Sequence, residues 1–194
     1  MFSLFFVKAY PQNYPFQDPA LDDEKRLDNL ISLMNQEEKV NCLSTRVGIP
    51  RLGVKGTWTV EGLHGLALSG PANWAVKGKG ASVTTTFPQA YGLAETWDPA
   101  LISQAASLEA EEARFLNQNK NYGRAGLIVF APNADLGRDV RWGRTEECFG
   151  EDAFLNGRMT VAFVKGLQGN DPKYWKTASL MKHFLANSNE NNRF

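Results

Sequence analysis

A continuous apolar run, GLIVFA, occupies residues 126–131 and stops at Pro132. An apolar run of this length with β-branched residues is typical of a strand that is buried on both faces of a sheet. An amphipathic helix pattern over 155–166 and a second strand candidate at 178–181 follow. A strand, a polar loop, a helix and another strand in this order predict an α/β fold with a parallel sheet. Both a (β/α)8 barrel and a doubly wound sheet satisfy that pattern.

Two short helices are predicted near the start of the chain. Residues 22–34 carry apolar side chains at the spacing i, i+3, i+4 and i+7, which gives a helix one apolar stripe. The stripe consists of Leu27, Leu30, Ile31 and Met34. Asn35 with Glu38 three residues later resembles a capping box, so a second helix is expected to begin there and to run through Leu43.

A longer helix is predicted after Asp98 and Pro99, because Asp is a favoured N-cap and Pro a favoured first helical residue. This helix is expected to run to about Asn117 and to bury Leu101, Ala105 and Leu108. Residues 48–80 are rich in glycine and are expected to form loops, which are more often functional than idle when they are long.

Composition and charge exclude several classes of partner. The chain has 194 residues, and 21 Lys and Arg balance 21 Asp and Glu. A nucleic-acid partner is not expected, because proteins that bind phosphates usually carry a basic excess. Membrane insertion is not expected either, since no apolar run approaches the roughly 18 residues of a spanning helix. The histidines and cysteines form no metal-binding motif, so neither a metal nor another cofactor is expected.

The first ten residues, MFSLFFVKAY, form a short apolar segment that Lys8 interrupts. We interpret this segment as the end of a secretory signal, which predicts a periplasmic or secreted protein. The alternative is a partly buried N-terminal segment.

The loop after the 126–131 run holds the densest group of charged residues, between Asn133 and Asp152. A solvated charged surface is the usual interpretation of such a stretch. This loop, however, leaves the carboxyl end of a strand, where ligands bind in barrels and open sheets. Arg144 offers a planar fork of donors that can bracket hydroxyl groups, and Glu147 is spaced to orient it. The spacing therefore predicts a ligand role for at least one of these arginines.

Three other side chains are candidates for the same site. Lys182 and His183 end the apolar run at 178–181, where a lysine reaches water only if the strand end opens into a cavity. Glu61 lies in a Gly-flanked turn, where a carboxylate can accept hydrogen bonds from a polyol. The alternatives are a surface lysine beside a hydrogen-bonded histidine, and a loop glutamate paired with an arginine. Tryptophans near these loops suit stacking on sugar faces, although core packing is their usual role; they are Trp58, Trp74 and Trp142.

Three stretches of the second half of the chain form specific motifs: APNADLGRDVRWGRTEECFGED (131–152), FVKGLQG (163–169) and KHFLANSNENNR (182–193). They resemble the N-terminal catalytic domain of the family 3 glycoside hydrolases. Upstream, IPRLGV, VEGLHGLA, TTTFPQA and GLAETWDP are similar to the β-glucosidase and β-xylosidase branch of that family. The resemblance covers residues 15–194. It implies an α/β fold, a (β/α)8 TIM barrel of which this chain carries only the N-terminal part, with residues 1–14 as a tail.

The resemblance also implies roles for individual residues. Glu61 matches the acidic residue that binds hydroxyls of the terminal sugar, which is Asp in many glucosidases and Glu in many xylosidases. Arg144, Lys182 and His183 match sugar-binding residues of the same subsite. The nucleophile Asp and the acid/base are expected beyond Phe194, so this chain is expected to hold no catalytic carboxylate pair and to be inactive alone. The rest of the barrel and a second domain are expected partners.

The function that the resemblance implies for the parent protein is hydrolysis of terminal non-reducing β-D-glycosyl residues. The substrate is expected to be a small oligosaccharide or β-glycoside, and the mechanism is expected to retain the anomeric configuration. The motif pattern favours β-glucosides. The alternatives are a β-xylosidase of the same family, since Glu61 leaves less room around the sugar ring than Asp does, and a sugar-binding remnant without catalysis.

Overall fold

The computed structural model describes residues 13–44, 47–56, 58–68, 84–118, 126–185 and 187–188. They form two compact units, one up to Lys55 and one from Gly56 onwards. The predictions for residues 1–10, for Trp74 and for the end of the KHFLANSNENNR stretch lie outside the described residues. The predicted boundary between an N-terminal tail (1–14) and the barrel domain (15–194) stays a prediction.

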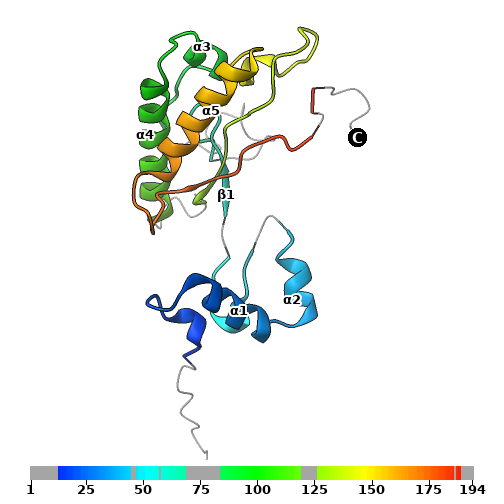
Figure 1. The fold of residues 1–194 in the computed structure, drawn as a ribbon, viewed down its shortest axis with the longest axis vertical. Helices are drawn as coiled ribbons and strands as arrows, with labels where there is room; N and C mark the ends of the chain where they lie inside the picture. The colour runs from blue at the N-terminus through cyan, green and yellow to red at the C-terminus, as the bar shows by residue number, and fades with distance from the viewer. Residues whose placement is uncertain are drawn as a thin grey trace, which may run out of the picture. The chain divides into compact units, whose positions relative to one another are not determined.

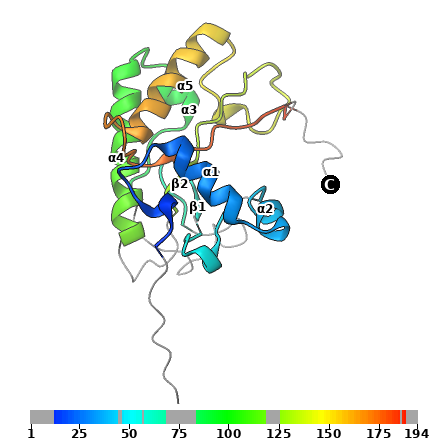
Figure 2. The same ribbon diagram turned by 60° about the horizontal axis from the view of Figure 1, so that its bottom comes forward.

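The first unit contains the two short helices that the sequence predicts, α1 (Asp23–Leu33) and α2 (Gln36–Asn41), shown in blue in Figure 2. The predicted capping box opens α2: Asn35 Oδ1 accepts from the Glu38 N–H at 2.8 Å, and Glu38 Oε2 accepts from the Asn35 N–H at 2.9 Å. Short 3-10 turns at Pro15–Gln17 and Pro50–Leu52 complete this unit. Its buried residues are Phe16, Ile49 and Leu52.

The second unit is built on a three-stranded parallel sheet in the order β1-β2-β3 among the described residues. These strands are β1 (Thr59–Glu61), β2 (Ile128–Phe130) and β3 (Ala178–Ser179). Helices α3 (Ala90–Ala94) and α4 (Pro99–Gln118) connect β1 to β2, and a 3-10 turn (Thr145–Glu147) and α5 (Ala153–Gln168) connect β2 to β3. The predicted α/β fold with a parallel sheet is confirmed.

Strand β1 lies inside the segment that the sequence predicts as loop. The three residues of β1 are too few to show the alternating hydrophobic pattern of a strand. Their extended conformation depends on pairing with a distant segment, in which Val60 lies opposite Val129. Tertiary pairing thus decides the structure of this segment, as is common for short strands.

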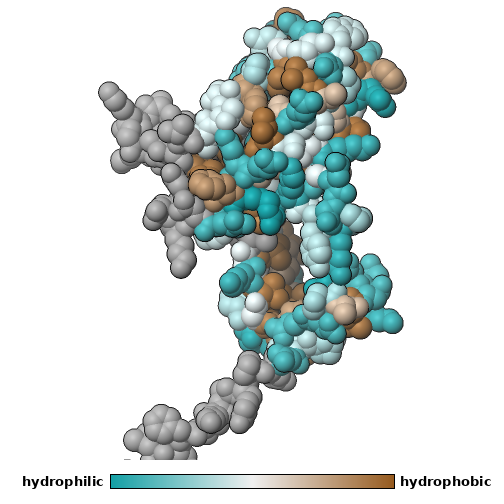
Figure 3. Space-filling view, turned by 90° about the vertical axis from the view of Figure 1, so that its left-hand side faces the viewer, coloured by the Kyte–Doolittle hydropathy of each residue, from teal (hydrophilic) through white to brown (hydrophobic). Residues whose placement is uncertain are grey.

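The helices α4 and α5 pack side by side over the sheet (Figure 1). Helix α4 turns small residues towards α5: Ala106 and Ala110 are fully buried, as is the larger Ile102 one turn before Ala106. Ala105 is buried as predicted, but the predicted burial of Leu101 and Leu108 is wrong, because they are 41% and 54% exposed. On the α4 side of this unit, apolar residues are dispersed among hydrophilic ones (Figure 3). The small face is buried in place of the leucines because it allows the two helices to approach closely.

Gly166 of α5 shows how close this approach is. A Cβ atom built on it would meet the Ser103 carbonyl oxygen, and it would lie 2.7 Å from the Ala106 Cβ. The sequence predicts that α5 ends at Gly166, but the helix continues to Gln168 and is capped by Gly169, whose φ is +76°. Gly166 therefore serves helix packing, and Gly169 ends the helix.

We expect Gly166→Val to destabilise the protein by about 1–3 kcal/mol, because the added atoms force α4 and α5 apart. Gly157→Ala is the matched control, since a Cβ at this position of the same helix meets nothing within 4 Å. The control is expected to be neutral or to stabilise by up to about 1 kcal/mol, because alanine has the higher helix propensity. Urea unfolding measures both; equal effects of the two changes would contradict close packing at Gly166.

Candidate functional site

The parallel sheet brings three separated segments of the chain to one edge. Glu61 is the last residue of β1, and Asn133 follows β2. The pairing continues past β3, where the Lys182 N–H donates to the Pro132 carbonyl at 3.1 Å and the Ala134 N–H donates to the Lys182 carbonyl at 2.7 Å. Because the carboxyl ends of parallel strands meet at the same edge, the polar residues that follow each strand lie together.

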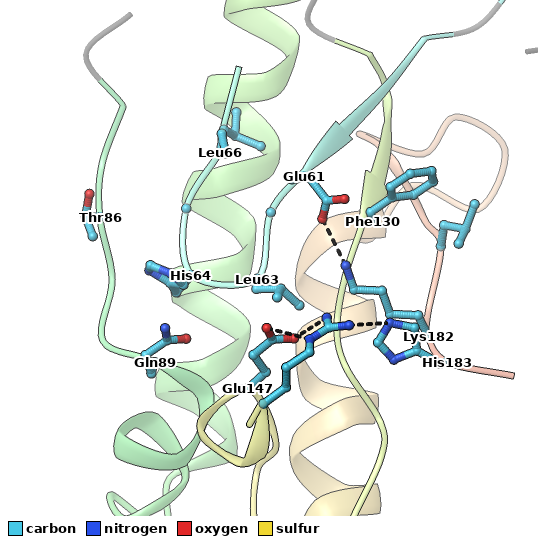
Figure 4. Close-up of a pocket in the computed structure, with 15 residues that line it drawn as sticks. Glu61, Leu63, His64, Leu66, Thr86, Gln89, Phe130, Glu147, Lys182 and His183 are labelled. Carbon is cyan, nitrogen blue, oxygen red and sulfur yellow. Dashed lines mark hydrogen bonds and ion pairs between the residues drawn. The ribbon is translucent and has the colours of Figure 1, made fainter. Parts of the chain in front are cut away.

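A pocket of about 820 Å³ lies at this edge (Figure 4). It brings together all four residues that the sequence and the family resemblance single out, namely Glu61, Arg144, Lys182 and His183. The other lining residues are Gly62, Leu63, His64, Gly65, Leu66, Ala67, Thr86, Gln89, Phe130, Glu147 and Leu180. One side of the pocket is therefore charged, while the other side is formed largely by apolar and uncharged polar residues.

Lys182 and Glu61 form an ion pair across the pocket. Lys182 Nζ lies 2.9 Å from Glu61 Oε2, and the two side chains are 13% and 35% exposed. The Lys182 ammonium group also lies 5.9 Å from the centre of the Phe130 ring. The ammonium group of Lys182 thus lies in a cavity at the strand end, as the sequence predicts, and not on the outer surface. Glu61 pairs with this lysine, whereas the alternative interpretation paired it with an arginine.

Arg144 is held by a carboxylate in the two-pronged geometry that its planar group favours. Its Nε donates to Glu147 Oε1 at 2.9 Å, and its Nη2 donates to Glu147 Oε2. The orienting role that the spacing predicts for Glu147 is confirmed. The turn that places Arg144 is anchored by Trp142, which is 4% exposed, and the Thr145 hydroxyl donates to the Trp142 carbonyl at 2.8 Å. Trp142 is thus a core residue and is not available to stack on a sugar.

His183 connects Arg144 to Asp135, a residue that the sequence analysis did not single out. His183 Nδ1 lies 2.7 Å from Asp135 Oδ2, and His183 Nε2 lies 3.3 Å from Arg144 Nη1. An ionised carboxylate only accepts hydrogen bonds and a guanidinium only donates them. These two neighbours therefore favour the tautomer in which Nδ1 carries the proton and the Nε2 lone pair faces Arg144. The sequence feature that could have identified Asp135 is its position shortly after the 126–131 strand, where ligand-binding residues are expected.

Asn187 also lies near His183, with Asn187 Nδ2 3.1 Å from His183 Nδ1. If Nδ1 carries the proton, the oxygen of the Asn187 amide faces it, because amide N and O positions are assigned from their partners. This assignment is compatible with the Asp135 contact.

The part of the charged loop around Asp139 and Arg141 faces solvent, which is the usual interpretation of such a charged stretch. Arg141 pairs with Asp139 within the loop, and its side chain is 87% exposed. The hydrogen bonds from Arg141 lower the pKa of Asp139 to about 2. The loop thus divides into an outward pair, the pocket residues Arg144 and Glu147, and Asp135, which contacts the pocket residue His183.

The uncharged wall of the pocket is a tight loop formed by residues 62–66, here called the 62–66 loop. It is closed by the Ala67 N–H, which donates to the Glu61 carbonyl at 2.9 Å. A second segment supports it: Thr84 Oγ1 donates to the Leu66 carbonyl at 2.8 Å, and the Phe87 N–H donates to the His64 carbonyl at 2.9 Å. Gly65, with φ +114°, leaves no room for a side chain against the Thr85 carbonyl. These bonds fix the loop that directly follows Glu61.

The described part of the chain contains no group of three or more His, Cys, Asp or Glu residues arranged to hold a metal ion. Among the same residues, no helix combines the length and the apolar character needed to cross a membrane.

Comparison with known proteins identifies the family. Residues 28–192 match the Glycosyl hydrolase family 3 N terminal domain, and the chain belongs to this family. A xylan 1,4-β-xylosidase of Xylanibacter ruminicola is 35% identical over 190 residues, which cover 93% of this chain and 21% of that protein. β-D-xylosidase 3 of Arabidopsis thaliana is 35% identical over 177 residues, covering 88% of this chain and 22% of that protein. The chain thus spans about a fifth of the length of these curated relatives.

Solved structures agree in fold. A GH3 exo-β-xylosidase in complex with a xylobiose aziridine activity-based probe superposes with a TM-score of 0.71 at 31% identity, over 88% of this chain and 22% of that one. β-Glucosidase 3B of Thermotoga neapolitana in complex with α-D-glucose gives a TM-score of 0.68 at 25% identity, over 87% of this chain and 24% of that one. The predicted fold class is confirmed: the parallel sheet and its helices correspond to the N-terminal barrel domain of family 3 enzymes.

We expect the proton of His183 to move from Nδ1 towards Nε2 when Asp135→Leu is combined with Arg144→Leu, because the acceptor at Nδ1 and the donor that faces Nε2 are then both lost. Asp135→Asn is expected to keep the wild-type form, since an amide oxygen also accepts. The chain has two histidines, so the ring nitrogen resonances can be assigned with His183→Gln and followed by ¹⁵N NMR. Asp139→Ala is the matched control in the same loop. An unchanged ring in the double variant would show that Asp135 and Arg144 do not set the tautomer.

Proposed function

We propose that the whole protein carrying this chain is a retaining exo-β-glycosidase, and that the pocket binds the hydroxyl groups of the terminal non-reducing sugar. The observation that carries the proposal is the convergence of Glu61, Arg144, Lys182 and His183 on one pocket, in a chain of the glycoside hydrolase 3 family. These side chains come from the ends of different strands, which is how barrel enzymes build their active sites.

The chemistry of the pocket suits a neutral polyol. A sugar hydroxyl both donates and accepts, so it can donate to Glu61 while it accepts from Lys182. The two charges are already 2.9 Å apart, which holds donor and acceptor in place before the substrate arrives. Arg144 is fixed in the same way by Glu147, so little side-chain freedom is lost when the sugar binds.

In a retaining glycosidase, two further carboxyl groups about 5–5.5 Å apart act as nucleophile and acid/base on an oxocarbenium-like transition state. In our proposal the pocket residues bind the sugar next to these groups, which we expect to lie beyond Phe194. Hydrogen bonds to the ring hydroxyls contribute to catalysis to the extent that they strengthen as the ring flattens. The residues of this chain thus act in binding and in stabilising that transition state.

We further propose that a β-xyloside is the preferred substrate and a β-glucoside the second, which reverses the order that the motif pattern favours. Curated relatives with 34–40% identity are named as β-xylosidases, among them proteins of Xylanibacter ruminicola and Arabidopsis thaliana. The similar solved structure of an exo-β-xylosidase is 31% identical, and that of the Thermotoga β-glucosidase 25%. Glu61 supports the same choice, because its longer side chain leaves less room for a sugar with an exocyclic CH2OH group.

Arg144→Ala in the whole protein is expected to lower kcat/KM on an aryl β-glycoside by 10²-fold or more, which is about 3 kcal/mol of lost transition-state stabilisation. The matched control is Arg141→Ala, which removes an arginine of the same loop that pairs outward with Asp139. The control is expected to stay within twofold of wild type (roughly 0.4 kcal/mol). Near-normal turnover by Arg144→Ala would exclude the proposed role of this arginine.

Glu61→Asp is expected to raise the ratio of kcat/KM for aryl β-glucoside over aryl β-xyloside by about 10-fold, the change that about 1.4 kcal/mol of differential binding gives. The shorter side chain leaves space beside the ring that only the larger sugar fills. Glu61→Gln, which keeps the length but loses the charge, is expected to lower activity on both sugars without this shift. A wild-type preference for the glucoside would contradict the proposed substrate order.

A further inference from the structure

Glu109 is a buried carboxyl group that the proposed chemistry does not use. It lies on α4 and is 1% exposed, and neither carboxyl oxygen has a hydrogen-bond partner in the described part of the chain. Burial raises the pKa of Glu109 to about 8, and the charge of Glu112 one turn away adds to the rise. The Gly65 amide opposes this rise without completing a hydrogen bond. An unpartnered charge at such a site is costly, so the carboxyl group is neutral over most of the physiological range.

The carboxyl group of Glu109 presses against the backbone of the pocket wall. The space that a Cβ atom on Gly62 would occupy is filled by Glu109 Oε1 and Val129 Cγ1. Gly62 directly follows Glu61, the proposed sugar-binding carboxylate, and both Gly62 and Gly65 line the pocket. Any displacement of Glu109 is therefore transmitted to the 62–66 loop and to the end of β1.

Glu112, one turn further along α4, supports the neighbouring segment while Glu109 supports the loop. Its carboxylate accepts from the Thr85 N–H at 3.1 Å and from the Thr85 hydroxyl. Thr85 lies against Gly65, so two carboxyl groups of one helix hold both segments of this wall. Glu112 is partly exposed and hydrogen-bonded, whereas Glu109 is buried and completes no hydrogen bond with the described residues.

Among the residues that the structure describes, no cation compensates a charge on Glu109. Val129 is the β2 side chain that faces it, and the loop presents backbone. The charged residues of α5 are exposed, and Lys176 pairs outward with Glu111. The titratable residues on the elements around Glu109 are Glu111, Glu112, Arg114, Glu61, His64, Arg158, Lys165 and Lys176. Of these, Glu112 is the one whose charge contributes to the pKa of Glu109.

We propose that Glu109 is a positioning residue for the sugar pocket: its buried neutral carboxyl group supports the 62–66 loop and so fixes Glu61 opposite Lys182, and its ionisation displaces the loop and weakens substrate binding. This inference rests on the proposed function for its effect on substrate. The effect on the loop is independent of substrate. An acid whose pKa is higher in the folded than in the unfolded state makes the protein less stable as pH rises from about 4.5 to about 8, because the folded state then holds more protons.

The test uses the whole protein, with Glu109→Gln as the neutral variant of similar shape and Glu109→Met as a second uncharged variant of similar length. Glu111→Gln on the exposed side of the same helix is the matched control. The first measurement is amide hydrogen exchange of the 62–66 loop at pH 6 and pH 9. Comparing variants at equal pH removes the intrinsic dependence of exchange on pH. The second measurement is kcat and KM for aryl β-xyloside between pH 6 and pH 9.

At pH 9 the loop is expected to exchange about tenfold faster in wild type and in Glu111→Gln than in either Glu109 variant, and at pH 6 all four are expected to agree. KM is expected to rise by a similar factor between pH 6 and pH 9 in wild type and in Glu111→Gln, and to stay flat in the Glu109 variants. A purely structural role of Glu109 would shift the unfolding temperature and leave the pH profile of KM unchanged.

Equal loop exchange in wild type and in both Glu109 variants at pH 9 would overturn the inference, as would a KM that rises with pH in those variants as it does in wild type. A protein without hydrolytic activity that still shows the exchange difference would overturn the proposed function and support the positioning role. The two failures are therefore distinguishable.

Discussion

The candidate site depends on the parallel pairing of β2 with β1 on one side and with β3 on the other. This register places Glu61 beside Phe130 and Ser179 beside Val129, and the chain after each strand leaves at the same edge. Lys182 and Glu61, 121 residues apart in sequence, meet only because of that arrangement. A partly exposed ion pair contributes on the order of 1 kcal/mol or less, far below the cost of ordering two chain segments. The sheet therefore positions the ion pair, and the ion pair does not hold the sheet.

Each cation of the pocket has its own carboxylate among the described residues. Lys182 pairs with Glu61 and Arg144 with Glu147, while the His183 ring lies between Asp135 and Arg144. A site built for phosphate or a carboxylate ligand leaves a cation or backbone N–H groups uncompensated. This pocket instead offers adjacent donors and acceptors without an excess of positive charge. Such an arrangement favours a ligand that is uncharged and rich in hydroxyl groups, as a sugar is.

Local signals in the sequence predicted the elements that local interactions form. Asn35 and Glu38 cap a helix with their own side chains. The apolar, β-branched run at 126–131 favours a strand by its composition alone, and β2 lies within it. The four site residues were found from strand-end position and family resemblance together, and the pocket contains all of them. Asp135 was not singled out, because its role requires a histidine 48 positions away, and the charge of a loop residue does not reveal its partner.

Glu109 and Glu112 differ in a way that the sequence alone does not predict. Both are glutamates on one helix, three residues apart, and both lie in a segment that reads as a charged helix face. Packing gives them opposite states: Glu112 bonds to Thr85 at the surface, and Glu109 is enclosed between Val129 and a glycine loop. The rotation of α4 that encloses Glu109 is the same rotation that leaves Leu101 and Leu108 exposed, and it follows from the small residues that α4 presents to Gly166. The close contact between two helices thus decides both the exposure of the leucines and the burial of a carboxyl group behind the pocket.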